Sequence, residues 1–550
     1  MTIKLVSSLE KVFLDEAPNV TNETCFNVVN LGDVFSFQAV IYLDLKTPRK
    51  NFADYEVVVE SEIENIIKVR QVGHVPSRMP LYHKTDGDFL RDSVGLYPDP
   101  LEEKEYVRLF SKSWNSIWID VSPTLDTKPG DFNITIKIKD HEGNVQGEAK
   151  TSVKILGISI PKAHFVHTEW FHTDCLAQYY NVPVFSDEYW RIVKNFMDTA
   201  VKMGQNMILT PVFTPPLDTA IGGERLTVQL VDVKQTPEGY VFCFDKLVRW
   251  IDLAREAGFE YFEISHLFTQ WGAAHAPKIM VTNCEGVLIK KFGWETDAAG
   301  DEYVGFLKAF IPKLLEVLQS KQADDKAYFH ISDEPSLKNI DQYKKIHSII
   351  KPLLKNQKMF DALSDAAFYK EGLVEIPVVA TDHYEDFQDF DIKERWVYYC
   401  SGQADEVSNR FFGYPEYRNR IIGVQLYLYE ITGFLQWGLN FYNTRLSTKA
   451  IDPFAVTDAG MAFPSGDSFI LYPGEKGAAW DSIRSMVFSA ALSDFHALKH
   501  LESLAGREFV VNLICEGLSE KITFKKYPQT AEYLLKLKAR VLHEIEKFKM

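Results

Sequence analysis

The first 160 residues alternate apolar and polar positions with a period of two, the pattern of strands that are buried on one face. The clearest stretches, separated by Gly, Pro and Asp turns, are residues 34–45, 55–62, 116–123 and 132–140. The sequence DHEGN at 140–144 predicts a hairpin turn, and residues 155–165 predict the last strand and the exit from it. We therefore predict an N-terminal antiparallel β-sandwich over residues 1–160.

From residue 165 the pattern changes to short apolar runs that alternate with helical segments, as in βα units. Eight runs predict strands, at 165–172, 206–213, 261–268, 327–332, 358–363, 377–384, 395–402 and 433–442. Helical patterns between them include 187–203, 244–257, 303–320 and 337–355, and residues 224–244 predict an inserted β-hairpin. Eight strands in one stretch predict a (β/α)8 TIM-type barrel over residues 161–505. Its eighth helix is 479–500, and a C-terminal helical extension follows over residues 506–550.

Composition agrees with a multidomain chain of mixed α/β and β class. The 550 residues are enough for two or three domains. The formal net charge of −16 argues against nucleic acid or an anionic membrane surface as the main partner. Aromatic residues make up 13% of the chain, with 10 Trp and 25 Tyr, and such residues also suit surfaces that stack on sugars.

The N-terminus carries scattered charges without a continuous apolar core, so we expect no secretory signal. No run approaches the roughly 20 apolar residues that span a bilayer. The six cysteines lie far apart without a CxxC motif and are expected to be reduced core residues: Cys25, Cys175, Cys243, Cys284, Cys400 and Cys515. We expect a cytoplasmic protein without a membrane partner, whereas its oligomeric state is not predicted by the sequence.

Active sites of such barrels lie at the carboxyl ends of the strands. The residues that end the predicted strands are rich in acids and aromatics: Glu169, Trp170, His266, Trp271, Asp333, Glu334, Asp382, His383, Tyr384, Tyr399, Trp437, Asn440 and Tyr442. Aromatic rings stack on the apolar faces of sugars and acids cleave glycosidic bonds, so this set favours a carbohydrate substrate. The alternative for each aromatic residue is packing, and for His266 and His383 it is a structural role.

The stretch AYFHISDEPS at 327–336 ends a buried strand on two adjacent carboxylates, Asp333 and Glu334. A single acid here is explained by capping of the helix predicted from 337, with Asp333 or Ser336 as the cap. Capping does not explain two acids, because side chains on a strand alternate between faces until the chain bends at Pro335. The two carboxylates then converge on one ligand from different heights, and we predict that they are catalytic.

The motifs of several other chemistries are missing. The sequence contains no GxGxxG, GxxxxGK or GxSxG, and no HExxH. The two histidines of HTEWFH at 167–172 point to opposite faces of a strand, so we predict no metal site. Hydrolysis without a cofactor is the chemistry that remains.

The strand end HISDEP, after a β-sandwich and at the fourth unit of a barrel, resembles the family 123 glycoside hydrolases, the β-N-acetylgalactosaminidases. GLYPDPL at 95–101 with SIWIDV at 116–121 resembles the amino-terminal domain of that family. GDSFILYPG at 466–474 and DSIRSMVFSAALSDFHAL at 481–498 resemble its segment after the last strand. The likeness covers most of the chain.

The resemblance implies a retaining reaction on a β-linked N-acetylhexosamine, most often N-acetylgalactosamine (GalNAc), without a cofactor. The substrate's own 2-acetamido oxygen attacks the anomeric carbon and forms an oxazolinium. Glu334 is implied to be the general acid and base, and Asp333 to orient the acetamido group. The sugar contacts that we expect are Trp170, His266, Trp271, Asp382, Tyr384, Tyr399, Trp437, Asn440 and Tyr442.

The chain departs from the family pattern at SIRSM and ALSDFHAL, where charged residues are commoner, and Arg484 is assigned a structural role. Two alternatives stay open. One is a double-displacement retaining glycosidase on another sugar, with Glu334 and a second acid such as Asp382. The other is a carbohydrate-binding protein without activity. We expect the sandwich to pack on the barrel and shape one rim of the cleft.

Overall fold

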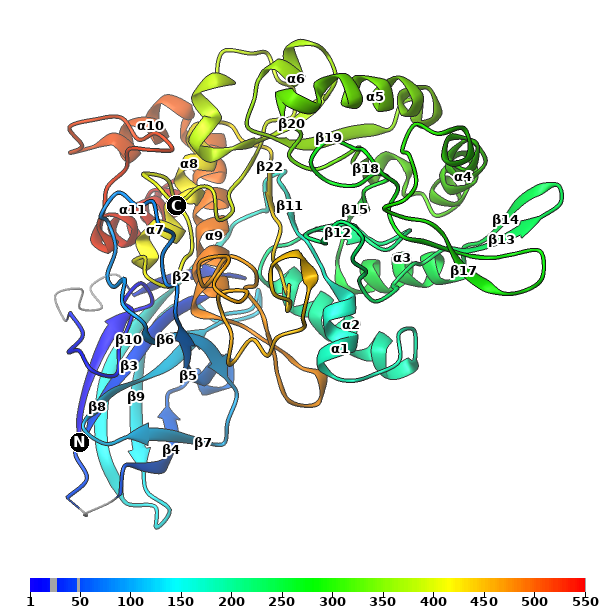
Figure 1. Ribbon diagram of the computed structural model, residues 1–550. Coiled ribbons are helices and arrows are strands. Elements are labelled where there is room, and N and C mark those ends of the chain that lie inside the picture. Colours follow the sequence, from blue (N-terminus) through cyan, green and yellow to red (C-terminus); the bar gives the residue numbers. More distant parts are fainter. Residues whose placement is uncertain (20–26, 47–49, 550) are drawn as a thin grey trace.

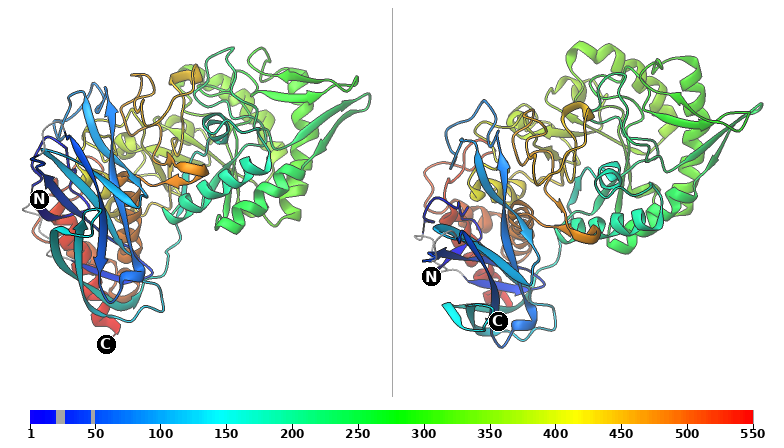
Figure 2. Two further views of the ribbon diagram at one scale, coloured as in Figure 1. Left: turned by 90° about the horizontal axis from the view of Figure 1, so that it is seen from below. Right: turned by 60° about the horizontal axis from the view of Figure 1, so that its bottom comes forward.

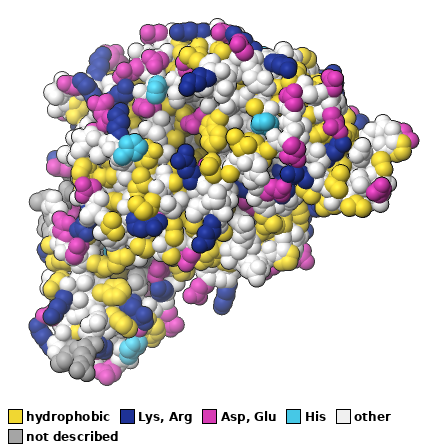
Figure 3. Space-filling model, viewed as in Figure 1, with side chains coloured by type: hydrophobic (Ala, Val, Ile, Leu, Met, Phe, Trp, Pro, Cys, Tyr) yellow, Lys and Arg dark blue, Asp and Glu magenta, His cyan; other side chains and the backbone are white. Residues whose placement is uncertain are grey.

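The structure is a computed structural model that describes residues 1–19, 27–46 and 50–549. A β-sandwich and a barrel lie side by side, with the last helices beside the contact between them (Figures 1 and 2). Acidic and basic side chains are intermingled over the face seen in Figure 3, without a large area of one sign. Within the described residues, no helix combines the length and apolar character that a bilayer crossing requires.

The sandwich consists of two five-stranded sheets. The first has the order β1 (Thr2–Ser7), β3 (Phe35–Leu43), β8 (Ser113–Val121), β5 (Ile67–Ser77) and β6 (Gly95–Glu102). The second has the order β2 (Val28–Leu31), β10 (Val145–Ser159), β9 (Gly130–Lys139), β4 (Phe52–Glu60) and β7 (Tyr106–Phe110). Inward residues of period two, such as Ile134, Ile136 and Ile138 of β9, form a separate core. The expected hairpin at 140–144 joins β9 to β10, which pair antiparallel.

One pairing corrects the antiparallel prediction. β2 runs parallel to β10, with Val28 opposite Lys154. Register between strands far apart in the chain is decided by which edges meet in space, and the alternation along one strand does not contain that information.

All eight predicted barrel strands form, and they close in chain order into a barrel of parallel strands. They are β11 (Val166–Glu169), β12 (Met207–Thr210), β15 (Tyr261–Ile264), β18 (Ala327–Phe329), β19 (Lys358–Leu363), β20 (Ile376–Ala380), β21 (Trp396–Tyr398) and β22 (Gly433–Gln436). β22 closes the ring by pairing with β11 from Val166–Gly433 to Glu169–Gln436.

The helical layer around the barrel is less regular than predicted. Its helices are α1 (Thr173–Tyr179), α2 (Asp187–Lys202), α3 (Asp245–Ala257), α4 (Asp301–Ser320), α5 (Ile340–Leu354), α6 (Ala367–Lys370), α7 (Glu416–Arg420), α8 (Ile422–Leu428) and α9 (Ile483–Ala505). After β19 only the single turn of α6 follows, and after β20 only the 3-10 helix Thr381–Asp386. The sequence showed helical patterns between most of the strands, and these two units have only short helices.

The predicted hairpin at 224–244 is part of a larger insertion. β13 (Asp232–Thr236) and β14 (Gly239–Cys243) pair as expected, and β13 also pairs with β16 (Ile279–Thr282), which continues into β17 (Leu288–Phe292). This sheet projects from the barrel (Figure 1). The sequence did not predict β16 and β17: β16 pairs with β13, where Thr282 lies opposite Lys234, and β17 pairs with β16.

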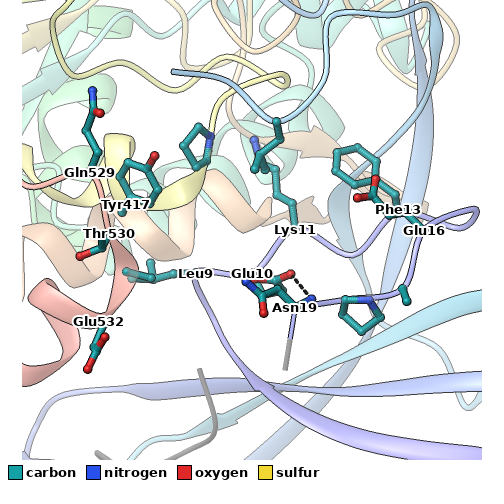
Figure 4. Close-up of a pocket in the computed structure, with 15 residues that line it drawn as sticks. Leu9, Glu10, Lys11, Phe13, Glu16, Asn19, Tyr417, Gln529, Thr530 and Glu532 are labelled. Carbon is teal, nitrogen blue, oxygen red and sulfur yellow. Dashed lines mark hydrogen bonds between the residues drawn. The ribbon is translucent and has the colours of Figure 1, made fainter. Parts of the chain in front are cut away.

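Buried polar contacts fasten the sandwich to the barrel. Arg484 of α9 forms a two-point ion pair with Asp99 of β6, at 2.9 and 2.8 Å, which bears out its structural assignment. Lys11 donates to the carbonyl oxygens of residues 411, 412 and 414 and pairs with Glu416 of α7 at 3.1 Å. Figure 4 shows Lys11 beside a hollow of about 520 Å³ between the N-terminal segment, α7 and the start of α11 (Ala531–Lys549). The contacts hold one edge of the sandwich against the barrel.

The C-terminal segment consists of α10 (Arg507–Cys515) and α11, which packs against both parts of the molecule. Lys538 of α11 donates to Asp33 of the sandwich at 3.1 Å and to Ser493 of α9 at 2.6 Å.

The cysteines are free in the described part of the chain, but they are not all core residues. Cys175 is buried, Cys400 and Cys515 are half-buried, and Cys243 and Cys284 are exposed on the projecting sheet. The prediction of core cysteines was wrong for the last two because β14 and the turn after β16 have an open face. Cys25 lies outside the described residues.

Candidate active site

The acid pair lies just beyond the carboxyl end of β18, where the chain turns over the barrel. Asp333 is half-buried and Glu334 is exposed. Glu334 has a φ of +43°, a left-handed conformation that costs a non-glycine residue about 1–2 kcal/mol. Neither the 3-10 helix Leu337–Asn339 nor α5 receives a side-chain cap. Helix capping by Asp333 or Ser336 therefore does not explain the two acids.

The Glu334 carboxylate is held by a tyrosine from another strand. Tyr398, the buried last residue of β21, donates its hydroxyl hydrogen to Glu334 Oε1 at 2.7 Å. β18 and β21 are not neighbours in the barrel, so this bond crosses its mouth. The side chain of Glu334 is thereby directed toward the barrel axis.

The loop after β15 supports Asp333 from the other side. The amide of Trp271 donates to the carbonyl oxygen of Asp333 at 2.9 Å, and Ser332 Oγ donates to the Thr269 carbonyl oxygen at 3.1 Å. Trp271 is itself left-handed, with a φ of +61°, and its side chain is 45% exposed. An exposed indole beside the acid pair is the arrangement expected of a sugar platform.

Beneath the pair, a buried histidine lies between two buried acids. His330 Nε2 is 2.6 Å from Glu263 Oε1 of β15, and His330 Nδ1 is 3.1 Å from Asp361 Oδ1 of β19. Tyr343 of α5 also donates to Asp361. Burial by itself lowers the pKa of His330, but the hydrogen bonds and charges of Asp361 and Glu263 outweigh it and raise the pKa to about 9. His330 is therefore an imidazolium at neutral pH.

We expect His330→Gln to lower the free energy of unfolding by about 3–5 kcal/mol, because it leaves two buried carboxylates without their cation. The pH dependence has a definite sign. The pKa of His330 is about 6.5 in the unfolded chain and about 9 in the folded protein, so the stabilisation is complete below pH 6.5 and is lost as the pH rises through 9. Urea unfolding at pH 6, 7.5 and 9 measures this slope. An equal slope in His330→Gln would contradict the assignment.

The pKa values of both catalytic candidates are raised. Burial raises the pKa of Asp333 well above its usual range, the neighbouring Glu334 charge raises it further, and the His330 charge opposes the increase. Glu334 is exposed as a residue, but its carboxyl group bonds to the buried Tyr398, and burial of that group raises its pKa, which the Tyr398 hydrogen bond lowers and the charge of Asp382 raises. Burial and neighbouring charges thus raise the pKa of both carboxyl groups, which favours the protonated form that a general acid needs.

Two more predicted residues lie beyond the carboxyl ends of β20 and β22. Asp382 Oδ1 lies 2.9 Å from His383 Nδ1 and accepts a hydrogen bond from Gln403 at 3.0 Å, and its charge acts on Glu334. Half-buried Trp437 donates its indole hydrogen to Asp467 Oδ2 at 3.1 Å. With Trp271, these are the predicted sugar contacts that the structure brings to the mouth of the barrel.

Trp170 and His266 are both inside the barrel. The Trp170 indole donates to Glu263 Oε1 at 2.6 Å. The His266 ring stacks on His330, with centroids 4.1 Å apart, and is fully buried. Both residues support the layer below the acid pair, and their predicted contact with sugar stays a prediction. Glu169 is likewise engaged, in a buried ion pair with Arg410 at 2.7 and 3.0 Å.

Tyr384 and Tyr399 point away from the barrel axis. Tyr384 packs against Tyr429 and Phe524, and Tyr399 lies against Phe434 in the layer under α9. The prediction failed for Tyr399 because side chains alternate along a strand: its neighbour Tyr398 is the residue that faces inward.

Tyr442 and Asn440 fasten the loop after β22. Tyr442 is buried and donates to the carbonyl oxygen of Leu471 at 2.8 Å. The Asn440 amide accepts from the backbone N–H of His172 at 2.9 Å and donates to its carbonyl oxygen at 3.1 Å. Their polar atoms are thus used within the protein, and the structure does not bring them to the acid pair.

Sequence reasoning missed Glu263, Asp361, Tyr398 and Asp467. Glu263 and Asp361 are single acids inside the apolar strands YFEI and KMFDAL, which is a usable signal because an acid in a buried strand needs a partner. Asp467 lies in a loop and is indistinguishable from a turn residue by its pattern. No group of three or more His, Cys, Asp or Glu residues in the described part of the chain has the arrangement of a metal site.

A parallel barrel with two acids at its mouth is an architecture that glycoside hydrolases use. The family model described as glycoside hydrolase 123, catalytic domain, matches residues 170–501, so the chain belongs to glycoside hydrolase family 123. The match confirms the resemblance noted in the sequence.

Among solved structures, the fold is similar to that of a family 123 glycoside hydrolase from Clostridium perfringens studied for glycolipid glycan hydrolysis. The identity is 15%, the TM-score is 0.70, and the match covers 100% of this chain and 97% of that one. A β-glucuronidase from Lactobacillus rhamnosus matches with 10% identity, a TM-score of 0.33, and coverage of 90% and 68%, which is too weak to carry an argument. No curated protein sequence matches the chain.

Proposed function

We propose that this glycoside hydrolase removes a terminal β-linked N-acetylhexosamine, with GalNAc as the preferred sugar, and that it retains the anomeric configuration through substrate assistance. Glu334 is the general acid and base, and Asp333 is the partner of the 2-acetamido group. The observation that carries the proposal is the acid pair itself: an exposed Glu334 in a strained turn beside a half-buried Asp333. Strain of this kind persists where a side chain is needed for function.

In the first step the acetamido oxygen attacks the anomeric carbon while Glu334 gives its proton to the leaving oxygen. The bond from the anomeric carbon to the aglycone breaks and an oxazolinium forms. Asp333 accepts a hydrogen bond from the acetamido N–H and stabilises the positive charge that develops on it. In the second step Glu334 takes a proton from water, which adds to the anomeric carbon and reopens the ring.

Substrate binding favours a proton on Glu334. In the free protein the pKa values of Asp333 and Glu334 are both raised. An acetamido N–H that donates to Asp333 favours its ionised form, and the ionised neighbour then raises the pKa of Glu334. The acetamido group thus favours protonation of the residue that must deliver the proton, and a sugar without this group lacks the effect.

Hydrolysis of matched aryl glycosides tests the proposal. We expect turnover of β-GalNAc and, more slowly, β-GlcNAc (N-acetylglucosaminide) substrates, and none of the β-galactoside, because the plain sugar lacks the internal nucleophile. Proton NMR of the first product formed should show the β-anomer. Equal turnover of the β-galactoside would instead favour double displacement, with an enzyme acid such as Asp382 as the nucleophile.

A further inference from the structure

Asp467 is a fully buried carboxylate at the mouth of the barrel that the proposed chemistry does not use. Its Oδ2 accepts the indole hydrogen of Trp437 at 3.1 Å, and its Oδ1 lies 3.4 Å from the amide nitrogen of Gln436. The backbone N–H of Ser401 also bonds to the carboxylate. These donors come from the end of β22 and from the loop after β21, so Asp467 joins two sides of the barrel mouth.

An aspartate is the side chain that these donors require. An ionised carboxylate only accepts hydrogen bonds, whereas asparagine would turn its own N–H₂ group toward one of the donors. Burial raises the pKa of Asp467 to about 7, and the Trp437 hydrogen bond and the Arg410 charge oppose the increase. Retaining an acid in a place that disfavours its charge indicates that its contacts matter.

The loop that carries Asp467 is anchored to the sandwich. Arg484 donates to the carbonyl oxygens of Gly466 and Phe469 at 2.8 and 2.9 Å. The same guanidinium is paired with Asp99 of β6, as described above. On its other side the loop presses on Gly438, where an added Cβ would lie 2.5 Å from the Ser468 carbonyl group. The position of Asp467 is therefore set from both sides.

Trp437, which Asp467 holds, directly follows the last residue of β22 at the mouth of the barrel. Its half-buried indole packs, as does Cys400, on the cluster inside the barrel that contains Tyr398, the residue bonded to Glu334. The charge of Glu334 acts on both Cys400 and Asp467. The indole of Trp437 and the acid pair thus border the same space.

We propose that Asp467 is a positioning residue that fixes the Trp437 indole as an aromatic wall for the sugar ring beside Glu334. The inference rests on the proposed function for the identity of the sugar. An indole whose N–H is hydrogen-bonded keeps one orientation. A sugar ring that stacks on it therefore spends less binding free energy on ordering the indole. The sandwich contributes through Asp99, which pairs with Arg484.

A double-mutant cycle with Asp467→Asn, Trp437→Phe and both changes together tests the pairing. We expect Asp467→Asn to raise KM for the aryl β-GalNAc substrate about tenfold with less than a threefold change in kcat, because a loosened wall weakens binding more than chemistry. The double variant should be no worse than Trp437→Phe alone. Additive losses, or an unchanged KM in Asp467→Asn, would overturn the proposal.

Fluorine NMR of protein labelled with fluorotryptophan gives a reading that needs no substrate. The Trp437 signal is identified by its disappearance in Trp437→Phe, and we expect it to shift and broaden in Asp467→Asn while the other nine signals stay in place. An unmoved Trp437 signal would refute the positioning role. If the wild type cleaves no acetamido sugar, the proposed function fails, and this spectrum still decides whether Asp467 positions Trp437.

Discussion

Glu334→Gln is expected to lower kcat/KM for a β-GalNAc substrate with a poor leaving group by about 10²–10⁴, the usual contribution of a general acid. Glutamine keeps the size of the side chain and can still accept the Tyr398 hydrogen bond, but it has no proton to deliver. The loss should shrink for aryl substrates whose phenol is acidic enough to leave without protonation. Measurement of kcat/KM over a series of phenol leaving groups gives this slope directly.

Azide and Glu334→Gly separate chemistry from folding. Azide should restore turnover of the activated substrates in Glu334→Gln, because it attacks the oxazolinium without a base, and the product should be the β-azide. Glu334→Gly relieves the strain of a φ of +43°, which stabilises the folded protein by about 1 kcal/mol. It also adds conformational entropy to the unfolded chain, which destabilises the folded protein by about 1 kcal/mol. We expect it to be inactive with a nearly unchanged free energy of unfolding. Retained activity in Glu334→Gly would refute the assignment of Glu334.

Asp333→Asn is expected to lower kcat/KM for acetamido substrates by about 10²–10³, since it removes the charge that stabilises the developing oxazolinium. The pH profile provides a second reading. Without the neighbouring carboxylate the pKa of Glu334 falls, so the alkaline limb of kcat/KM should move to lower pH. Rates from pH 4 to pH 9 for both proteins measure the shift.

Asp382→Asn is the matched control for Asp333→Asn. It also removes a carboxylate that acts on Glu334, but in our proposal it does not touch the reacting atoms. We expect its effect on kcat to be much smaller. If Asp382→Asn proved the more damaging change, and a glycosyl-enzyme were trapped on Asp382, the reaction would be double displacement.

Much of the fold could be predicted from local pattern. All eight barrel strands were predicted, because a continuous apolar run with a helical segment behind it has few other interpretations. The β2–β10 and β13–β16 parallel pairings were not, since both join distant segments, and the local hairpin of β16 and β17 was not predicted either. The sequence also did not show that only short helices follow β19 and β20, because the connections there carry no clear helical pattern.

In the candidate site too, local pattern identified some residues, and others depend on contacts between distant segments. Asp333 and Glu334 were found because two acids at the end of a buried strand contradict the usual pattern. Tyr399 was named and Tyr398 was not, because the three residues of β21 are too few to show which of the alternating side chains face the barrel axis. Asp467 was missed because its partners Trp437 and Ser401 are 30 and 66 residues away.

By itself, the sequence determined the order of strands, the class of the two folded parts and the acids at the mouth of the barrel. These are properties of consecutive residues: hydrophobic period, turn chemistry and charge at a strand end. Only the tertiary structure decided which side chains reach those acids and how they titrate. The reason is physical, since a pKa depends on burial, hydrogen bonds and charges within a few ångströms. Glu334 receives its hydrogen bond from Tyr398 and feels the charge of Asp382, and these two residues belong to other βα units of the barrel.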